Sequence, residues 1–169
     1  KNKIIPKDQR DKDVKEVQNY QTVLKMMLSD TSNGNILNKE KILNYHYLAM
    51  QQIPEIAGKF RKIPVYIKGN PNFKIVSWKN IEKYLKDLLD EYNDFVSKKH
   101  DIKDIIKFAA YFHNQFQYIH TFVDGNSRTT RILTFHILRY FKIPILDMPL
   151  GLLDRYLTNT KGYKKRDDN

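Results

Sequence analysis

Residues 132–138 read Ile-Leu-Thr-Phe-His-Ile-Leu, a run that is apolar on nearly every side of a helix. A helix with one apolar stripe can lie on the surface, but one that is apolar all round must be covered by other elements. Pro144 stops this helix, because proline lacks the N–H that a helix interior needs. The chain must therefore fold around a central helix, with other helices arranged about it.

Several other stretches can supply the helices of such a bundle. Apolar residues recur in them at spacings of three and four, and they cover residues 13–28, 39–51, 78–96 and 102–119. Ser77 is a suitable N-cap for the third of these helices. Residues 150–159 predict a last short helix, and the polar cluster at 29–34 predicts a loop.

The helical pattern is interrupted between residues 60 and 76. Two β-prone runs, 60–67 and 73–76, flank a Lys-Gly-Asn-Pro-Asn turn, which indicates a hairpin. Pro64 cannot donate a hydrogen bond to a sheet, so the first run is expected at an edge. The predicted fold class is therefore all-α, a helical bundle with one small β-hairpin.

The length of 169 residues and the 41% share of hydrophobic residues indicate one folded domain. We divide the chain into an N-terminal lead-in at 1–12, a domain at 13–160 and a basic tail at 161–169. Cysteine is absent, which excludes disulfides and thiolate zinc sites and fits a reducing, cytoplasmic location. No run approaches the ~18 apolar residues of a membrane span, so no membrane partner is expected.

The formal net charge of +11 permits nucleic-acid, membrane-surface or anionic nucleotide partners. The lysines are scattered along the amphipathic stretches rather than gathered on one of them, which favours their interpretation as solvated helix faces. A nucleic-acid-binding or protein-interaction module nevertheless stays open as a different class of function.

Chemically active side chains are most concentrated in residues 120–131, His-Thr-Phe-Val-Asp-Gly-Asn-Ser-Arg-Thr-Thr-Arg, where one helix ends and the next begins. Gly125 allows the turn, and the first backbone N–H groups of the second helix lack intrahelical acceptors, so they can bind an anion. Arg128 and Arg131 lie three residues apart and project from one helix face, where both can hold phosphate oxygens.

Two further residues of this segment suit metal binding and proton transfer. Asp124 offers hard carboxylate oxygens, which Mg²⁺ uses together with substrate phosphates. Neutral His120 can accept a hydroxyl proton near pH 7. A metal site built from His113, His120 and Asp124 is not supported, because no His-Glu-x-x-His spacing is present. The segment therefore predicts a site for a nucleoside triphosphate, a metal ion and a base.

The same segment resembles the signature of the Fic family, His-x-Phe-x-(Asp/Glu)-Gly-Asn-(Gly/Lys)-Arg-x-x-Arg, and departs from it only at Ser127, where glycine is usual. Three more stretches are similar to the family: Glu-Val-Gln-Asn-Tyr at 16–20, Gly-Lys-Phe-Arg at 58–61, and the helix of His113 that leads into the signature. The resemblance spans roughly residues 13–157 and implies a Fic-type helical bundle.

The resemblance implies a protein adenylyltransferase, which transfers AMP from ATP to a Ser, Thr or Tyr hydroxyl of a target protein with Mg²⁺ as cofactor. In this interpretation His120 deprotonates the hydroxyl, Asp124 holds the metal and Arg131 meets the γ-phosphate. The implied catalytic residues are His120, Asn126, Arg128 and Arg131. The implied phosphate-binding residues are Gly125, Asn126, Ser127, Arg128 and Arg131.

The resemblance also implies macromolecular partners. The hairpin would be a flap that aligns the target segment by strand-like pairing, through Lys62, Ile63, Val65, Tyr66 and Ile67. No inhibitory (Ser/Thr)-x-x-x-Glu-(Gly/Asn) motif occurs in this sequence, so an inhibitory helix is expected upstream of Lys1 or in a separate antitoxin. A homo-oligomer stays open.

Ser127 keeps the reaction itself open. A serine adds bulk where glycine lets the backbone approach phosphate closely, but it also adds a hydroxyl that can donate to phosphate. Removal of AMP, or transfer of another phosphate-containing group, are therefore alternatives to AMP transfer.

Overall fold

The computed structural model describes residues 7–67 and 73–145, and in this part of the chain all regular structure is helical. The elements are α1 (Lys7–Ser32), α2 (Lys39–Ala49), the 3-10 helix η1 (Trp78–Asn80), α3 (Ile81–Val96), α4 (Ile102–Ile119) and α5 (Asn126–Tyr140). None of these helices is both long enough and apolar enough to cross a membrane. The prediction of an all-α fold is confirmed.

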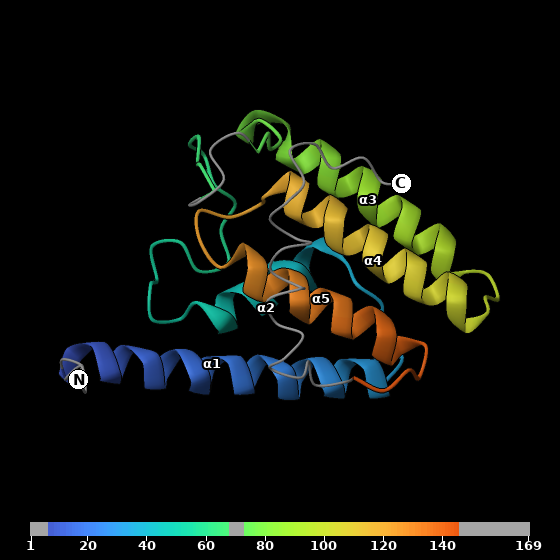
Figure 1. Ribbon diagram of the computed structural model, residues 1–169, viewed down its shortest axis with the longest axis horizontal. Coiled ribbons are helices and arrows are strands. Elements are labelled where there is room, and N and C mark those ends of the chain that lie inside the picture. The colour runs from blue at the N-terminus through green and yellow to red at the C-terminus, as the bar shows by residue number, and fades with distance from the viewer. Residues whose placement is uncertain (1–6, 68–72, 146–169) are drawn as a thin grey trace, which may run out of the picture.

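Helix α5 lies at the centre of the bundle (Figure 1). It packs against α1, α2 and α4, while α3 packs against the opposite side of α4. Its Ile132, Leu133, His136 and Ile137 side chains are all fully buried. The apolar run therefore forms the central helix that its composition predicts, and its burial leaves the N-terminus of α5 little room to shift.

The predicted β-hairpin is wrong for the described residues, because neither 60–67 nor 73–76 forms a strand. The buried guanidinium of Arg61 binds a backbone carbonyl in each run, and a sheet would need such carbonyls for its ladder. Pro64 also lacks a donor, and two strands alone are only marginally stable. The expected turn at 68–72 lies outside the described residues.

The first helix is longer than its apolar spacing predicts. It begins at Lys7, within the expected lead-in, and it continues through part of the expected loop to Ser32. The Ser32 hydroxyl donates to the Leu28 carbonyl four residues earlier, so this polar side chain is satisfied inside the helix. The predicted helix at 150–159 and the tail at 161–169 lie outside the described residues.

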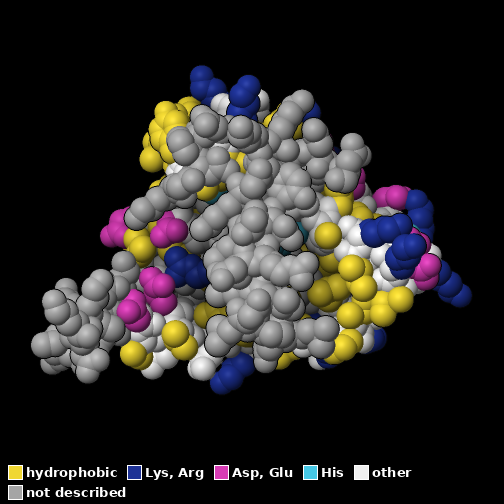
Figure 2. Space-filling model, viewed as in Figure 1, with side chains coloured by type: hydrophobic (Ala, Val, Ile, Leu, Met, Phe, Trp, Pro, Cys, Tyr) yellow, Lys and Arg dark blue, Asp and Glu magenta, His cyan; other side chains and the backbone are white. Residues whose placement is uncertain are grey.

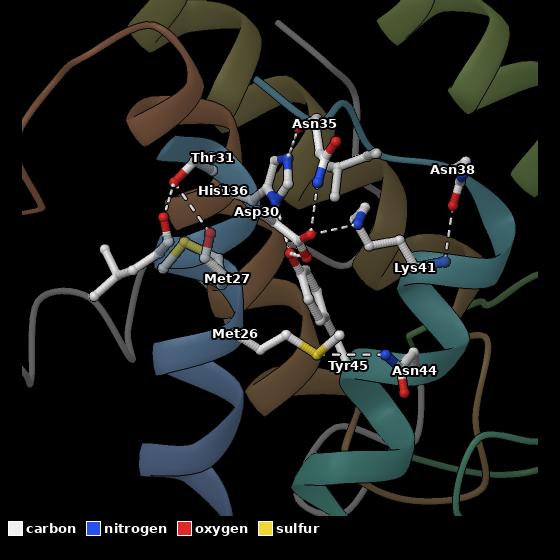
Figure 3. Close-up of polar contacts among 12 residues, drawn as sticks. Met26, Met27, Asp30, Thr31, Asn35, Asn38, Lys41, Asn44, Tyr45 and His136 are labelled. Atoms are coloured by element: carbon white, nitrogen blue, oxygen red, sulfur yellow. Dashed lines mark hydrogen bonds and ion pairs between the residues drawn. The ribbon is translucent and has the colours of Figure 1, made fainter. Parts of the chain in front are cut away.

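A buried polar cluster joins three of the helices (Figure 3). The Tyr45 hydroxyl of α2 donates to Asp30 Oδ2 of α1 at 2.7 Å and lies 2.9 Å from His136 Nδ1 of α5. Lys41 Nζ donates to Asp30 Oδ1 at 2.7 Å, and His136 Nε2 lies 2.9 Å from the Asn35 carbonyl oxygen. The cluster fixes the register of α1, α2 and α5, because buried polar groups are costly to leave without partners.

Charged side chains are dispersed over the surface. On the face shown in Figure 2, the described lysine and arginine side chains lie at the top, bottom, left and right instead of in one patch, and acidic side chains lie beside those at the left and right. Ion pairs between residues four positions apart join Lys83 with Asp87 and Lys86 with Asp90 within α3, and Asp94 of α3 with Lys98 just beyond its end. This pattern agrees with the interpretation of the lysines as solvated helix faces.

Two fully buried histidines make the fold sensitive to acid. Burial lowers the pKa of His46 to about 4 and, in the same way, the pKa of His136 to about 4. An unfolded chain would bind protons at these positions near the ordinary pKa of about 6.5. The folded state is therefore favoured above pH 6.5, and this contribution is lost as the pH falls toward 4.

We expect the free energy of unfolding to fall by roughly 2 kcal/mol per histidine between pH 7 and pH 5. Urea unfolding at a series of pH values measures this slope, and His46→Gln and His136→Gln should each flatten it. His100→Gln, at a half-buried position beyond the end of α3, is the control. A slope that survives the double substitution would show that other groups cause the acid sensitivity.

Candidate active site

The loop between α4 and α5 brings the end of one helix close to the start of the next (Figure 1). His120 is the C-cap of α4 and has left-handed backbone angles, with a φ of 51°. Gly125 is the N-cap of α5, also with a positive φ. The predicted base and the predicted anion-binding N–H groups therefore lie at the two ends of one short loop.

The surroundings of His120 favour one tautomer. Its backbone N–H donates to the Phe116 carbonyl at 3.1 Å, which completes the last turn of α4. Its Nδ1 lies 3.4 Å from the carbonyl oxygen of Gln117, an acceptor only, so Nδ1 carries the proton in this contact. The lone pair of the neutral ring is then on Nε2, the atom that would accept a proton.

The start of α5 is the helix N-terminus at which an anion is expected to bind. The Thr129 N–H donates to the Gly125 carbonyl at 2.9 Å as the first bond of the helix, and the N-cap Gly125 has no side chain that could bind the N–H groups of residues 126–128. The Asn126 side chain is buried, and its amide accepts from the Phe122 N–H at 2.9 Å and donates to the Phe122 carbonyl at 2.8 Å. Asn126 thus shapes the loop with its side chain, and its backbone N–H faces the anion site.

Gly125 is required at its position for two separate reasons. Its φ of 78° lies in the left-handed region, which side chains resist. A Cβ atom there would also lie 2.8 Å from Met50 Sδ and 3.2 Å from His46 Nε2. Any side chain would therefore displace the buried Met50 and His46 side chains or the loop itself.

The His46 side chain of α2 holds the loop between α4 and α5 in place by hydrogen bonds and a ring contact. Its Nδ1 accepts from the Gly58 N–H at 2.9 Å, and its Nε2 donates to the Asp124 carbonyl at 3.0 Å. Its ring stacks on Phe122 with centroids 3.6 Å apart and planes 5° apart. The helical spacing places His46 on the buried side of its helix, but nothing in the sequence indicates that it holds the loop.

The two arginines face one space, as predicted. Arg128 and Arg131 line a cavity of about 410 Å³ whose opposite wall is formed by Asp13, Glu16, Val17, Tyr20 and Gln21 of α1. Arg128 Nη1 lies 3.0 Å from Glu16 Oε2, and its Nη2 lies 3.7 Å from Asp124 Oδ2. The sequence similarity at Glu16 therefore corresponds to a direct ion pair with an expected phosphate-binding residue.

Asp124 could supply one carboxylate ligand to a metal ion, but not a complete set of protein ligands. Its side chain is 61% exposed, and its Oδ1 accepts from the Gly125 N–H at 2.6 Å. Among the described residues no group of three or more His, Cys, Asp or Glu side chains could hold a metal ion. A Mg²⁺ ion bound by Asp124 would need phosphate and water oxygens for its other ligands, which is the usual coordination of Mg²⁺ beside a nucleotide.

Ser127 and the expected flap residues also lie near the loop. The Ser127 hydroxyl accepts from Gln117 Nε2 at 3.4 Å, which leaves its own proton available for a different acceptor. Of the expected docking residues, Lys62, Ile63 and Tyr66 are exposed, whereas Val65 and Ile67 are half-buried. The segment begins beside the loop, because the Arg61 N–H donates to the carbonyl of Thr121, next to His120.

The chain is similar to several known proteins. A ribonucleoside-diphosphate reductase small chain of Ostreid herpesvirus 1 (isolate France) is 34% identical over 112 residues, which cover 59% of this chain and 19% of that protein. The protein adenylyltransferase Fic of Drosophila persimilis is 26% identical over 155 residues, which cover 85% of this chain and 28% of that protein. This chain thus spans less than a third of either relative.

A solved structure has the same fold. The crystal structure of a Fic domain containing signaling protein from Bacteroides thetaiotaomicron has a TM-score of 0.75 and 22% identity, covering 85% of this chain and 55% of that chain. The family model of the Fic/DOC family matches residues 36–138, which is more than half of the 169 residues and contains the whole loop between α4 and α5. The chain therefore belongs to the Fic/DOC family.

Proposed function

We propose that this chain transfers AMP from ATP to a hydroxyl group of a target protein. The observation that carries the proposal is the loop that holds His120 at one end and the uncapped N-terminus of α5, with Arg128 and Arg131, at the other. The adenylyltransferase name of the Drosophila persimilis relative supports the same reaction.

The reaction needs a base, a phosphate site and a stable geometry. His120 Nε2 takes the proton of the target hydroxyl, and the hydroxyl oxygen attacks the α-phosphorus of ATP. The bond between the α-phosphorus and the bridging oxygen to the β-phosphate breaks, and pyrophosphate leaves. The N–H groups at the start of α5 hold phosphate oxygens, while Arg128 and Arg131 stabilise the charge of the leaving pyrophosphate.

Asp124 and the segment 62–67 complete the proposed site. Asp124 would hold a Mg²⁺ ion, which supplies positive charge that balances the phosphates when it is bound. Lys62, Ile63, Val65, Tyr66 and Ile67 are proposed to receive the target segment along their backbone, beside His120. Exposure of Lys62, Ile63 and Tyr66 agrees with that use.

Ser127 favours a second candidate reaction in the same site. Its side chain stands where the family usually has none, and Gln117 Nε2 holds its oxygen at 3.4 Å. A triphosphate seated differently around Ser127 would present another phosphorus to the hydroxyl, so that a phosphate-containing group other than AMP is transferred. Mass spectrometry of protein incubated with ATP and Mg²⁺ distinguishes the two reactions, because the mass added to the acceptor identifies the transferred group.

We expect His120→Ala to lower the rate of self-labelling with labelled ATP by about 10²–10⁴-fold, because the variant lacks the general base. Binding of ATP should change little, since the anion site and both arginines remain. His100→Ala, a histidine outside the site, is the control. Undiminished labelling by His120→Ala would refute the role of His120 as the base.

We expect Asp124→Ala to remove the effect of Mg²⁺ on ATP affinity, because Asp124 is the carboxylate of the loop between α4 and α5 and its side chain is 61% exposed. Calorimetric titration of ATP at several Mg²⁺ concentrations measures this effect. Asp87→Ala, which removes an exposed carboxylate of α3, should leave the metal response intact. If Asp124→Ala retains the response, the metal binds elsewhere.

We expect Glu16→Gln to strengthen ATP binding by about two- to fivefold, because an incoming phosphate would no longer compete with the Glu16 carboxylate for Arg128. Titration of a fluorescent ATP analogue measures the change. Glu40→Gln removes an exposed carboxylate from α2 and controls for net charge. Weaker binding in Glu16→Gln would mean that Glu16 orients Arg128 for the nucleotide instead of competing with it.

A further inference from the structure

Arg61 is a buried arginine whose partners are all backbone carbonyls. Only 2% of the residue is exposed, and none of the ion pairs among the described residues includes it. Its guanidinium donates to the carbonyl oxygens of His120 at 2.6 Å, Ile63 at 3.1 Å, Ile119 at 3.4 Å and also Val76. Burial lowers the pKa of Arg61 from its ordinary value, but an arginine side chain stays charged in a protein.

One of these bonds, from Arg61 Nε to the His120 carbonyl oxygen at 2.6 Å, connects Arg61 to the residue that is expected to be the base. His120 has a φ of 51° and a ψ of 58°, a left-handed conformation that residues other than glycine rarely adopt. The peptide after His120 is held in place by the Arg61 Nε–H bond to the His120 carbonyl, a charge-assisted bond of 2.6 Å. The direction of the imidazole depends on this peptide, since the side chain leaves the same backbone.

The same guanidinium also binds the start of the expected target-docking segment 62–67 and the chain that leads from Val76 into η1. Ile63 lies at the beginning of that segment and Val76 lies after it. Two backbone bonds act at the same two places: the Arg61 N–H donates to the Thr121 carbonyl of the loop, and the Val76 N–H donates to the Tyr118 carbonyl of α4, both at 3.1 Å. One planar group with five donors therefore sets the position of the segment relative to the base.

We propose that Arg61 is a positioning residue, which aligns His120 with the segment that receives the target. This inference rests on the proposed transfer reaction, but it concerns a side chain that touches neither ATP nor the target hydroxyl. A role in stability alone would not require that the same side chain bind both the left-handed residue His120 and the start of the docking segment at Ile63.

The test compares Arg61→Lys and Arg61→Gln with the unchanged protein. Lysine keeps the charge but is a point donor that cannot span four carbonyls, and glutamine keeps only a neutral amide. We expect self-labelling with labelled ATP to slow by about tenfold or more in both variants, because misplacement of a reacting group is costly.

The affinity for ATP with Mg²⁺, measured by calorimetry, should stay within about twofold, because Arg61 lies outside the phosphate site. Arg139→Lys, at the far end of α5, is the matched control.

A second measurement does not depend on transfer. The backbone and imidazole NMR signals of His120 should shift in both Arg61 variants and stay unchanged in Arg139→Lys. In Arg61→Gly, added guanidinium ions should restore the signals and the labelling rate together. If the unchanged protein does not label itself, the proposed reaction fails, and the His120 signals still decide the role of Arg61. Unchanged His120 signals, or ATP affinity falling in step with the labelling rate, would overturn the inference.

Discussion

The loop of the candidate site rests on a neutral imidazole buried between two backbone groups. His46 Nδ1 accepts from the Gly58 N–H and its Nε2 donates to the Asp124 carbonyl, so both ring nitrogens are used and only the neutral form fits. The ring stacks on Phe122, whose backbone in turn binds both ends of the Asn126 amide. Contacts within the protein thus fix the direction of the backbone at the start of α5, and no phosphate ligand is needed for this.

These contacts of His46 and Phe122 matter because a helix N-terminus binds an anion well only when its N–H groups are held in place. The central burial of α5 fixes the helix axis, and the loop fixes where the axis begins. Gly125 can lie close to Met50 and His46 because it has no Cβ. As the N-cap residue it also has no side chain that could bind the first N–H groups of α5. Pre-arranged dipoles of this kind stabilise phosphate charge without reorganisation during the reaction.

The sequence predicts those parts of the site that depend on local spacing. The central helix follows from residues 132–138, and the shared face of the two arginines follows from their separation by three positions. The hairpin fails because the sequence pattern shows β propensity but not the competition of Arg61 for the same carbonyls. His46 is missed for a related reason: periodicity shows that a residue is buried, but not which distant backbone groups it will meet, and these lie 12 and 78 positions away.

The net charge of the whole chain and the charged groups of the candidate site have different effects on ligand binding. The net charge of +11 favours the approach of any polyanion, but such a field is screened by salt and does not select a ligand. Selection has to come from the site, where Glu16 and Asp124 already lie close to Arg128. An incoming ligand can bind the Arg128 guanidinium only if it carries more negative charge than the carboxylates that it displaces. It must also place hydrogen-bond acceptors at the N–H groups of α5. Under the proposed function, a triphosphate would meet both conditions, whereas a single carboxylate or a singly charged phosphate ester would gain little from the exchange.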